Sequence, residues 1–246
     1  MESHMEQHPQ LLPPESKEFE SKVIIITGGA SGIGRAAFDA FTEKGAHVVV
    51  FDIAPKPEGL TQSQYKNVDV SKWEEVEPAV NEVAREFNGI DIAISNAAMK
   101  VSGNLLELPS ETFAQLLKVN ALGPWNLAKA AMPHLIKSKG TLLFVSSGTS
   151  ENLPANADGY FMSKGATYTG PHALQASFGD KITIRAIAPG PVDTPLWREG
   201  KSPTVIEKML AGNLGPKVET PQKIAQDIIS LASRNNAAFN GKILRL

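Results

Sequence analysis

Short continuous apolar runs alternate with amphipathic, helix-like stretches along most of the chain. Such runs, often rich in β-branched residues, are typical of strands buried on both faces of a parallel sheet. They predict strands at 23–26, 47–51, 65–70, 90–95, 140–145, 182–188 and 242–246, and the periodic stretches predict helices at about 34–44, 71–87, 110–137, 158–179 and 220–234. The alternation predicts an α/β fold: one doubly wound, seven-stranded parallel sheet with helices on both faces.

Two segments do not follow this alternation. Residues 1–20 are polar, contain prolines and lack periodicity, so we expect a flexible tail before a single domain at 21–246. Residues 193–220 are irregular, with apolar residues and one short helical stretch, which is typical of a lid beside a site. Within the regular part, Ser71 with Glu74 three residues later predicts a capping box at a helix start.

Composition narrows the class of protein. Of the 246 residues, 42% are apolar and 20% charged, and the net charge of −2 offers no basic field for nucleic acid or an anionic membrane. No cysteine is present, which excludes disulfides, thiolate metal sites and cysteine nucleophiles, and the scattered histidines predict no metal site. The polar N-terminus resembles no secretory signal. We therefore expect a soluble cytoplasmic protein that binds a small molecule.

A glycine-rich turn, TGGASGIG at 27–34, joins the first strand to the first helix. Together with the second strand it forms a βαβ unit of about 30 residues, as dinucleotide-binding proteins have. Gly28 allows the turn, Gly32 lets the backbone approach a pyrophosphate, and Gly34 lets the helix pack on the sheet. Asp52, at the end of the second strand, can accept hydrogen bonds from an adenosine ribose and would repel a 2′-phosphate. The alternative is that Asp52 is an ordinary turn residue.

Tyr160 and Lys164 are four residues apart and share one face of a predicted helix. An ammonium beside a phenol favours the phenolate, so Lys164 is expected to lower the pKa of Tyr160 and make it a general acid/base. Taken by itself, such a pair is more often two neighbours on an amphipathic helix. Asn120 lies in the middle of another predicted helix, where asparagine is a poor former, so it is either exposed or specifically required.

These residues together resemble the short-chain dehydrogenase/reductase family, in its compact form with a Rossmann fold. The matching motifs follow the family's order and spacing across 21–246: TGGASGIG at 27–34, Asp52, DV at 69–70, NAA at 96–98, Asn120 in KVNALG, the serine pair 146–147, YFMSK at 160–164 and PGPVDT at 189–194. Ala98 replaces a glycine that is usual in the family, which predicts a reshaped pocket mouth.

The resemblance implies a catalytic tetrad: Asn120, Ser147, Tyr160 and Lys164. Ser147 is chosen over Ser146 because the family's catalytic serine stands thirteen residues before the tyrosine, and Ser146 would face away. In this scheme Ser147 hydrogen-bonds the substrate carbonyl, Tyr160 donates the proton, and a nicotinamide delivers hydride. Lys164 binds the nicotinamide ribose, and Asn120 holds a water that relays protons to Lys164.

The resemblance also implies NAD(H) rather than NADP(H), because Asp52 matches the NAD-type residue and the adjacent Phe51, Ile53 and Ala54 carry no charge. The implied cofactor-binding residues are Gly28, Ser31, Gly32, Ile33, Gly34, Asp52, Asp69, Val70, Asn96, Ala97, Tyr160, Lys164, Pro189, Gly190, Val192 and Thr194. The implied substrate-binding residues are Ser147, Leu153, Tyr160, Leu196 and Trp197, which favour a largely apolar carbonyl or alcohol.

The sequence therefore predicts an NAD(H)-dependent oxidoreductase that interconverts a secondary alcohol and a ketone. Two alternatives use the same residues: a nucleotide-binding protein without turnover, and a dehydratase or isomerase that uses the acid/base pair without redox chemistry. The intact tetrad favours the oxidoreductase. Family members are commonly homotetramers or homodimers built on the helices at 110–137 and 158–179, and the apolar Trp125 and Phe178 there lead us to expect a homo-oligomer.

Overall fold

The computed structural model describes residues 10–148 and 154–246. Its elements in chain order are β1 (Val23–Thr27), α1 (Gly32–Glu43), β2 (His47–Asp52), η1 (Gln62–Gln64), β3 (Tyr65–Asn67), α2 (Trp73–Glu86), β4 (Ile92–Ser95), α3 (Ser110–Leu117), η2 (Lys118–Leu122), α4 (Gly123–Ser138), β5 (Thr141–Val145), α5 (Asp158–Phe178), η3 (Gly179–Lys181), β6 (Thr183–Ala188), α6 (Pro195–Arg198), α7 (Pro203–Leu210), α8 (Pro221–Ala232), η4 (Arg234–Phe239) and β7 (Ile243–Arg245). Within these two ranges no helix is both long and apolar enough to cross a bilayer.

The seven strands form one parallel sheet in the order β3-β2-β1-β4-β5-β6-β7. β1 lies between β2 and β4, so the strand order reverses there. In open α/β sheets, ligands bind outside the carboxyl ends of the strands at such a switch point. The predicted doubly wound α/β fold is confirmed, and the switch point marks where a site is expected.

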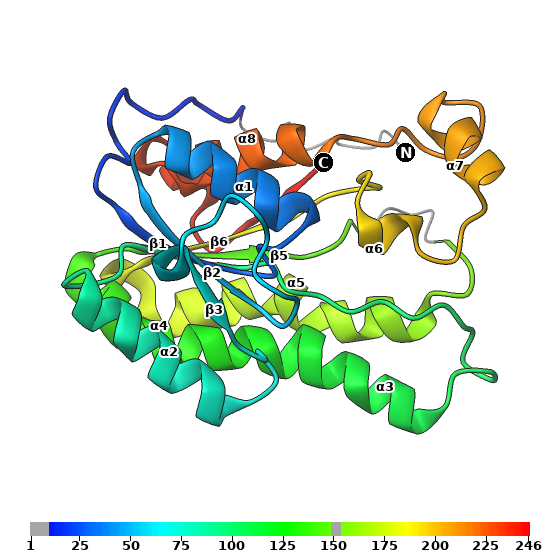
Figure 1. The fold of residues 1–246 in the computed structure, drawn as a ribbon, viewed down its shortest axis with the longest axis horizontal. Helices are drawn as coiled ribbons and strands as arrows, with labels where there is room; N and C mark the ends of the chain where they lie inside the picture. The colour runs from blue at the N-terminus through cyan, green and yellow to red at the C-terminus, as the bar shows by residue number, and fades with distance from the viewer. Residues whose placement is uncertain (1–9, 149–153) are drawn as a thin grey trace, which may run out of the picture.

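Helices cover both faces of the sheet. α1 and α8 pack on one face, and α2, α4 and α5 pack on the other (Figure 1). Successive β1 side chains point to opposite faces, so Ile24 and Ile26 enter the first core and Ile25 the second. Because both faces are buried, most positions of these strands carry apolar side chains, which is the pattern that predicted them.

The single helix expected at 110–137 is interrupted. The chain forms α3, then the π-helical turn η2, then α4. In η2 the N–H of Gly123 donates to the carbonyl of Lys118, five residues back. Pro124 follows and has no N–H for the carbonyl of Asn120, four residues earlier. Asn120 therefore lies in a π-turn rather than in a regular helix, which is why a poor helix former is tolerated there.

The predicted capping box at Ser71 is wrong. α2 begins at Trp73, and the Ser71 hydroxyl instead donates to Oδ1 of Asp69 at 2.7 Å. The carboxylate that reaches back is Glu75, whose Oε2 accepts from the Asp69 N–H at 2.8 Å. The strand expected at 65–70 also ends early, at Asn67. Both differences arise because Asp69 turns the chain after β3 and recruits these partners.

Part of the expected tail, within residues 10–20, contacts the domain. Phe19 is buried and meets Phe41 edge to face, with ring centroids 5.1 Å apart. The Glu18 carboxylate accepts a hydrogen bond from Ser233 Oγ at 2.7 Å. These partners are distant in sequence, which is why local polarity did not predict the docking.

Candidate active site

A cavity of about 930 Å³ opens at the carboxyl ends of β1, β2, β4 and β5. It extends from the glycine turn after β1 and the end of β2 to α5 and α6. The expected site residues that line it are Gly28, Ser31, Gly32, Ile33, Asp52, Asp69, Val70, Asn96, Ala97, Tyr160, Lys164, Thr194 and Leu196. Residues spread over most of the chain are thus brought to one side of the sheet.

The other expected residues lie around the cavity. Gly34, Asn120, Pro189 and Val192 are buried, Ser147 and Trp197 are half-buried, and Gly190 is exposed. The ammonium of Lys201 covers the Trp197 ring at 4.7 Å from its centroid, so this ring has a partner of its own. Leu153 lies outside the described residues.

Close backbone contacts in the turn after β1 leave no room for a side chain at two of its glycines. Gly28 has a φ of +66°, and a Cβ there would lie 2.7 Å from the Cα of Ala97. A Cβ on Gly34 would lie 2.2 Å from the carbonyl oxygen of Gly28, so only glycine lets α1 begin this close to the turn. The first turn of α1 contains no acidic residue. Its N–H groups and dipole are therefore free to face an anion, which fits a dinucleotide pyrophosphate.

Thr27 and Asn96 tie this turn to the loop after β4. Thr27 Oγ1 accepts from the N–H groups of Asn96 and Ala97 at 3.0 and 3.1 Å. Asn96 Nδ2 donates to the carbonyls of Thr27 and Gly28 at 3.0 and 2.9 Å. The Asn96 amide therefore fixes the shape of the turn. Thr27 opens the glycine motif, but the motif by itself does not predict this role for its hydroxyl.

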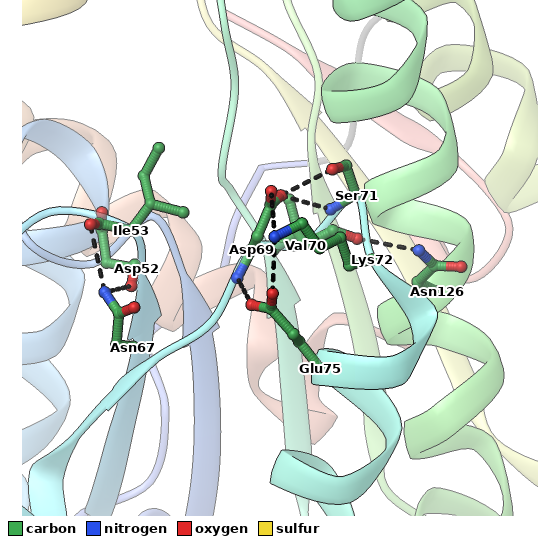
Figure 2. Close-up of polar contacts among 9 residues, drawn as sticks. All are labelled: Asp52, Ile53, Asn67, Asp69, Val70, Ser71, Lys72, Glu75 and Asn126. Carbon is green, nitrogen blue, oxygen red and sulfur yellow. Dashed lines mark hydrogen bonds and ion pairs between the residues drawn. The ribbon is translucent and has the colours of Figure 1, made fainter.

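The Asp52 end of the cavity is held by backbone donors. Its two carboxylate oxygens accept from the N–H groups of Ala30 and Ala54, both at 2.9 Å. Asn67 Nδ2 donates to the carbonyls of Asp52 and Ile53, each at 3.2 Å, as Figure 2 shows. Ile53 itself is 72% exposed. The carboxylate is thereby fixed on the wall where an adenosine ribose is expected.

Asp69 and Val70 are fixed by a second group of contacts (Figure 2). Burial acts to raise the pKa of Asp69, but hydrogen bonds from Ser71 and the charge of Lys72 outweigh it, and the pKa lies below its usual value. The buried Asn126 of α4 donates to the Val70 carbonyl at 2.9 Å. The sequence gives no indication of this role for Asn126, because a polar residue within a helical pattern carries no signal of what it faces.

Asn120 is fully buried, and its amide contacts the loop after β4. Oδ1 accepts from the Met99 N–H at 2.8 Å, and Nδ2 donates to the Met99 carbonyl at 2.8 Å. Nδ2 also donates to Ser163 Oγ on α5 at 2.8 Å. Both Nδ2 protons of Asn120 are thus used within the protein, and its Oδ1 accepts one hydrogen bond.

The two serines at the end of β5 have different partners. Ser146 is buried and lines the cavity, but its Oγ accepts from Thr167 Oγ1 at 3.1 Å. The Ser146 hydroxyl is therefore paired with Thr167 on α5 rather than with Tyr160. The Ser147 side chain hydrogen-bonds with Tyr160. This contact distinguishes Ser147 as the hydroxyl paired with the phenol.

The electrostatics of Tyr160 and Lys164 differ from the sequence-based prediction. Burial raises the pKa of Tyr160, and the hydrogen bond with Ser147 only partly offsets it. Burial lowers the pKa of Lys164 from 10.5 to about 8, while its ammonium donates to the Val145 carbonyl at 2.9 Å. The prediction that Lys164 lowers the pKa of Tyr160 is thus wrong for the polypeptide by itself, because desolvation of the phenolate outweighs the other effects on this pKa.

Known proteins share this architecture. The family model described as enoyl-(acyl carrier protein) reductase matches residues 28–246. The chain belongs to the short-chain dehydrogenase/reductase family. L-Fucose dehydrogenase of Bos taurus is 33% identical over 236 residues, which cover 87% of this chain and 84% of that protein. Meso-2,3-butanediol dehydrogenase of Serratia marcescens is 29% identical, with 91% and 92% covered.

The ligand-free structure of the aldohexose dehydrogenase of Thermoplasma acidophilum superposes with a TM-score of 0.85 at 26% identity, and the match covers 94% of each chain. These family members are oxidoreductases by name. The protein is accordingly an oxidoreductase of the short-chain dehydrogenase/reductase family.

The lowered pKa of Lys164 gives stability a specific pH dependence. In unfolded chains the lysine keeps a pKa near 10.5, so between pH 8 and pH 10 the unfolded state binds more protons and the free energy of unfolding rises with pH. Between pH 8 and pH 10 the free energy of unfolding of the wild type should rise by about 2 kcal/mol relative to that of Lys164→Met. Denaturant titrations at pH 8, 9 and 10 measure it.

Lys208→Met removes an exposed lysine on α7 and serves as the control, whose pH dependence should follow the wild type. Parallel curves for wild type and Lys164→Met would show that Lys164 keeps its ordinary proton affinity in the folded protein.

Proposed function

We propose that the protein is an NAD(H)-dependent oxidoreductase that interconverts a secondary alcohol and a ketone, with Tyr160 as the general acid/base. The observation that carries this proposal is the single cavity that joins Asp52 at one end to Tyr160 and Lys164 at the other. A nucleotide site and an acid/base pair thereby share one space, as hydride transfer to a bound carbonyl requires.

The chemistry assigned to the protein is proton transfer and orientation. In reduction, the Ser147 hydroxyl donates a hydrogen bond to the carbonyl oxygen and the Tyr160 phenol donates its proton to that oxygen as the carbon accepts hydride. Because burial raises the pKa of Tyr160, the phenol stays protonated at neutral pH, which suits the acid role. In oxidation, the same atoms return the proton to Tyr160.

The proposed position of the cofactor is based on the residues that line the cavity. A bound nicotinamide dinucleotide supplies or accepts the hydride. Its pyrophosphate would face the α1 N-terminus at Gly28, Ser31 and Ile33, and its adenosine would lie between Asp52 and the Asp69–Val70 turn. Lys164 and Asn96 would contact ribose groups, and the segment from Pro189 to Thr194 would contact the nicotinamide amide.

We propose a small hydroxylated substrate, such as a sugar or a vicinal diol. The relatives named above act by name on L-fucose, 2,3-butanediol and aldohexoses. Beside the apolar Leu196 and Val101, the cavity lining includes Lys100 and Arg198, which can donate hydrogen bonds to hydroxyls. The largely apolar substrate expected from the sequence is the competing prediction.

The substrate proposal is tested by turnover across sugars, diols and apolar ketones, followed by NADH absorbance. Tyr160→Phe should lower kcat by about 100-fold or more, because general acid/base catalysis contributes about that much or more. NADH binding, followed by fluorescence, should stay nearly unchanged. Tyr168→Phe removes a hydroxyl from the same helix, where it pairs with Arg245, and should keep full activity.

Turnover that survives in Tyr160→Phe would exclude the proposed acid/base role. Tight NADH binding without turnover of any substrate would favour the binding-only alternative. Product formed from a substrate with no change in NADH would favour the dehydratase or isomerase.

Asp52 is proposed to select NADH over NADPH. Its carboxylate is fixed by the N–H groups of Ala30 and Ala54, so it cannot easily turn away from a 2′-phosphate. Asp52→Ala should therefore lower the ratio of kcat/KM for NADH to that for NADPH by roughly tenfold or more, since this removes one repulsive charge. The exposed Asp39→Ala variant is the control, and an Asp52→Ala ratio equal to that of the control would place the selectivity elsewhere.

We also propose a homo-oligomer, a dimer or tetramer. Four large apolar side chains remain exposed on α3, η2, α4 and α5, namely Leu117, Leu122, Trp125 and Met162, with Trp125 and Met162 60% and 61% exposed. We infer that these side chains form one apolar patch, of the kind that marks an interaction surface. Phe178, by contrast, packs against the core.

The homo-oligomer is tested by light scattering. The measured mass should be a whole multiple of the chain mass, and Trp125→Glu should reduce the measured mass. A monomeric wild type would contradict the proposal.

A further inference from the structure

A continuous chain of buried hydrogen bonds joins the loop after β4 to the catalytic turn of α5. Asn120 contacts Met99 through both ends of its amide, and its Nδ2 donates to Ser163 Oγ at 2.8 Å. Ser163 Oγ in turn donates to the backbone carbonyl of Tyr160 at 2.7 Å. Asn120 and Ser163 are both fully buried. The chain therefore links three segments that are far apart in sequence.

The direction of each hydrogen bond is determined by chemistry. Because the Met99 N–H can only donate and the Met99 carbonyl can only accept, the Asn120 amide cannot flip. Its second Nδ2 proton is then directed at Ser163, so the Ser163 oxygen accepts and its own proton goes to the Tyr160 carbonyl. An alanine at position 163 could satisfy neither neighbour.

We propose that Ser163 is a positioning residue for the reaction, which holds Asn120 and the Tyr160 turn of α5 in one fixed arrangement. The proposal rests on the function proposed above. Ser163 contacts no cavity surface, so it acts through its two partners. Their relative placement matters because the Asn120 π-turn and the Tyr160 hydroxyl belong to different elements, η2 and α5, which pack against each other at Ser163.

Loss of the Ser163 hydroxyl has a predictable chemical consequence. A buried donor on Asn120 is left without an acceptor, and the turn that carries Tyr160 loses a tether. As that turn relaxes, the hydrogen bond between Ser147 and Tyr160 weakens. Since this bond lowers the pKa of Tyr160, its weakening raises that pKa further. In alcohol oxidation, where Tyr160 must accept a proton, activity should then appear only at higher pH.

The test is the pH profile of kcat for alcohol oxidation in Ser163→Ala. We expect kcat to fall about tenfold, as sub-ångström misplacement of catalytic groups produces. We expect the pH of half-maximal kcat to rise by about half a unit or more, and the KM for NAD⁺ to change less than about twofold. Ser163→Thr restores a hydroxyl and should recover much of both losses.

Ser177→Ala is the matched control, because Ser177 lies on the same helix and its hydroxyl also donates to a helical carbonyl, that of Ala173 at 3.3 Å, at an exposed position. It should keep the wild-type kcat and pH profile. If Ser163→Ala does not fold, Ser163→Cys replaces it, since a thiol keeps the side-chain shape but is only a weak donor and acceptor.

A Ser163 variant that melts at lower temperature but keeps the wild-type kcat and pH profile would overturn the proposal, since its role would then be structural. Because the wild type is assayed alongside, failure of the proposed function is recognised separately. If the wild type shows no Tyr160-dependent turnover, both proposals fall; if it does and Ser163→Ala matches it, only the positioning role falls.

Discussion

The hydrogen bond from the buried Lys164 ammonium to the Val145 carbonyl joins the sheet to α5, which also carries Tyr160. Removing a charged amine from water is costly, and here the cost appears as a pKa lowered to about 8. The arrangement is tolerated because the carbonyl at the end of β5 compensates part of the lost hydration. It also fixes α5 with Tyr160 facing the cavity, so the geometry of the site depends on this contact.

Buried polar groups also find partners from distant segments at the other end of the cavity. Parallel strands end in loops whose polar groups have no partners in the sheet, and here side chains from other loops supply them. Thr27 and Asn96 join the glycine turn to the loop after β4, and Asn126 holds the Val70 carbonyl. Buried polar groups therefore set the cavity's shape, while the apolar layers below supply the stability.

Much of the fold and of the candidate site was predictable from the sequence, because these features depend on residues that are close together along the chain. Continuous apolar runs gave the strands, since a strand buried on both faces requires them. Gly28 and Gly34 were recognisable because the backbone conformations and close approaches they permit exclude any side chain. Spacing placed Tyr160 and Lys164 on one helix face, and the family's spacing singled out Ser147, whose hydroxyl hydrogen-bonds with Tyr160.

What the sequence could not provide depends on partners distant along the chain. The docking of Phe19 and Glu18 and the hydrogen-bond network through Asn120 and Ser163 each join segments that come together only on folding. The pKa of Tyr160 also depends on segments distant in sequence, because the whole fold decides how deeply the phenol is buried. This burial raises the pKa, whereas a neighbouring lysine was expected to lower it. The sequence by itself thus determined the order of strands and helices and the residue types of the site. Only the tertiary structure decided which polar groups meet and how strongly water is excluded, because both depend on packing between distant segments.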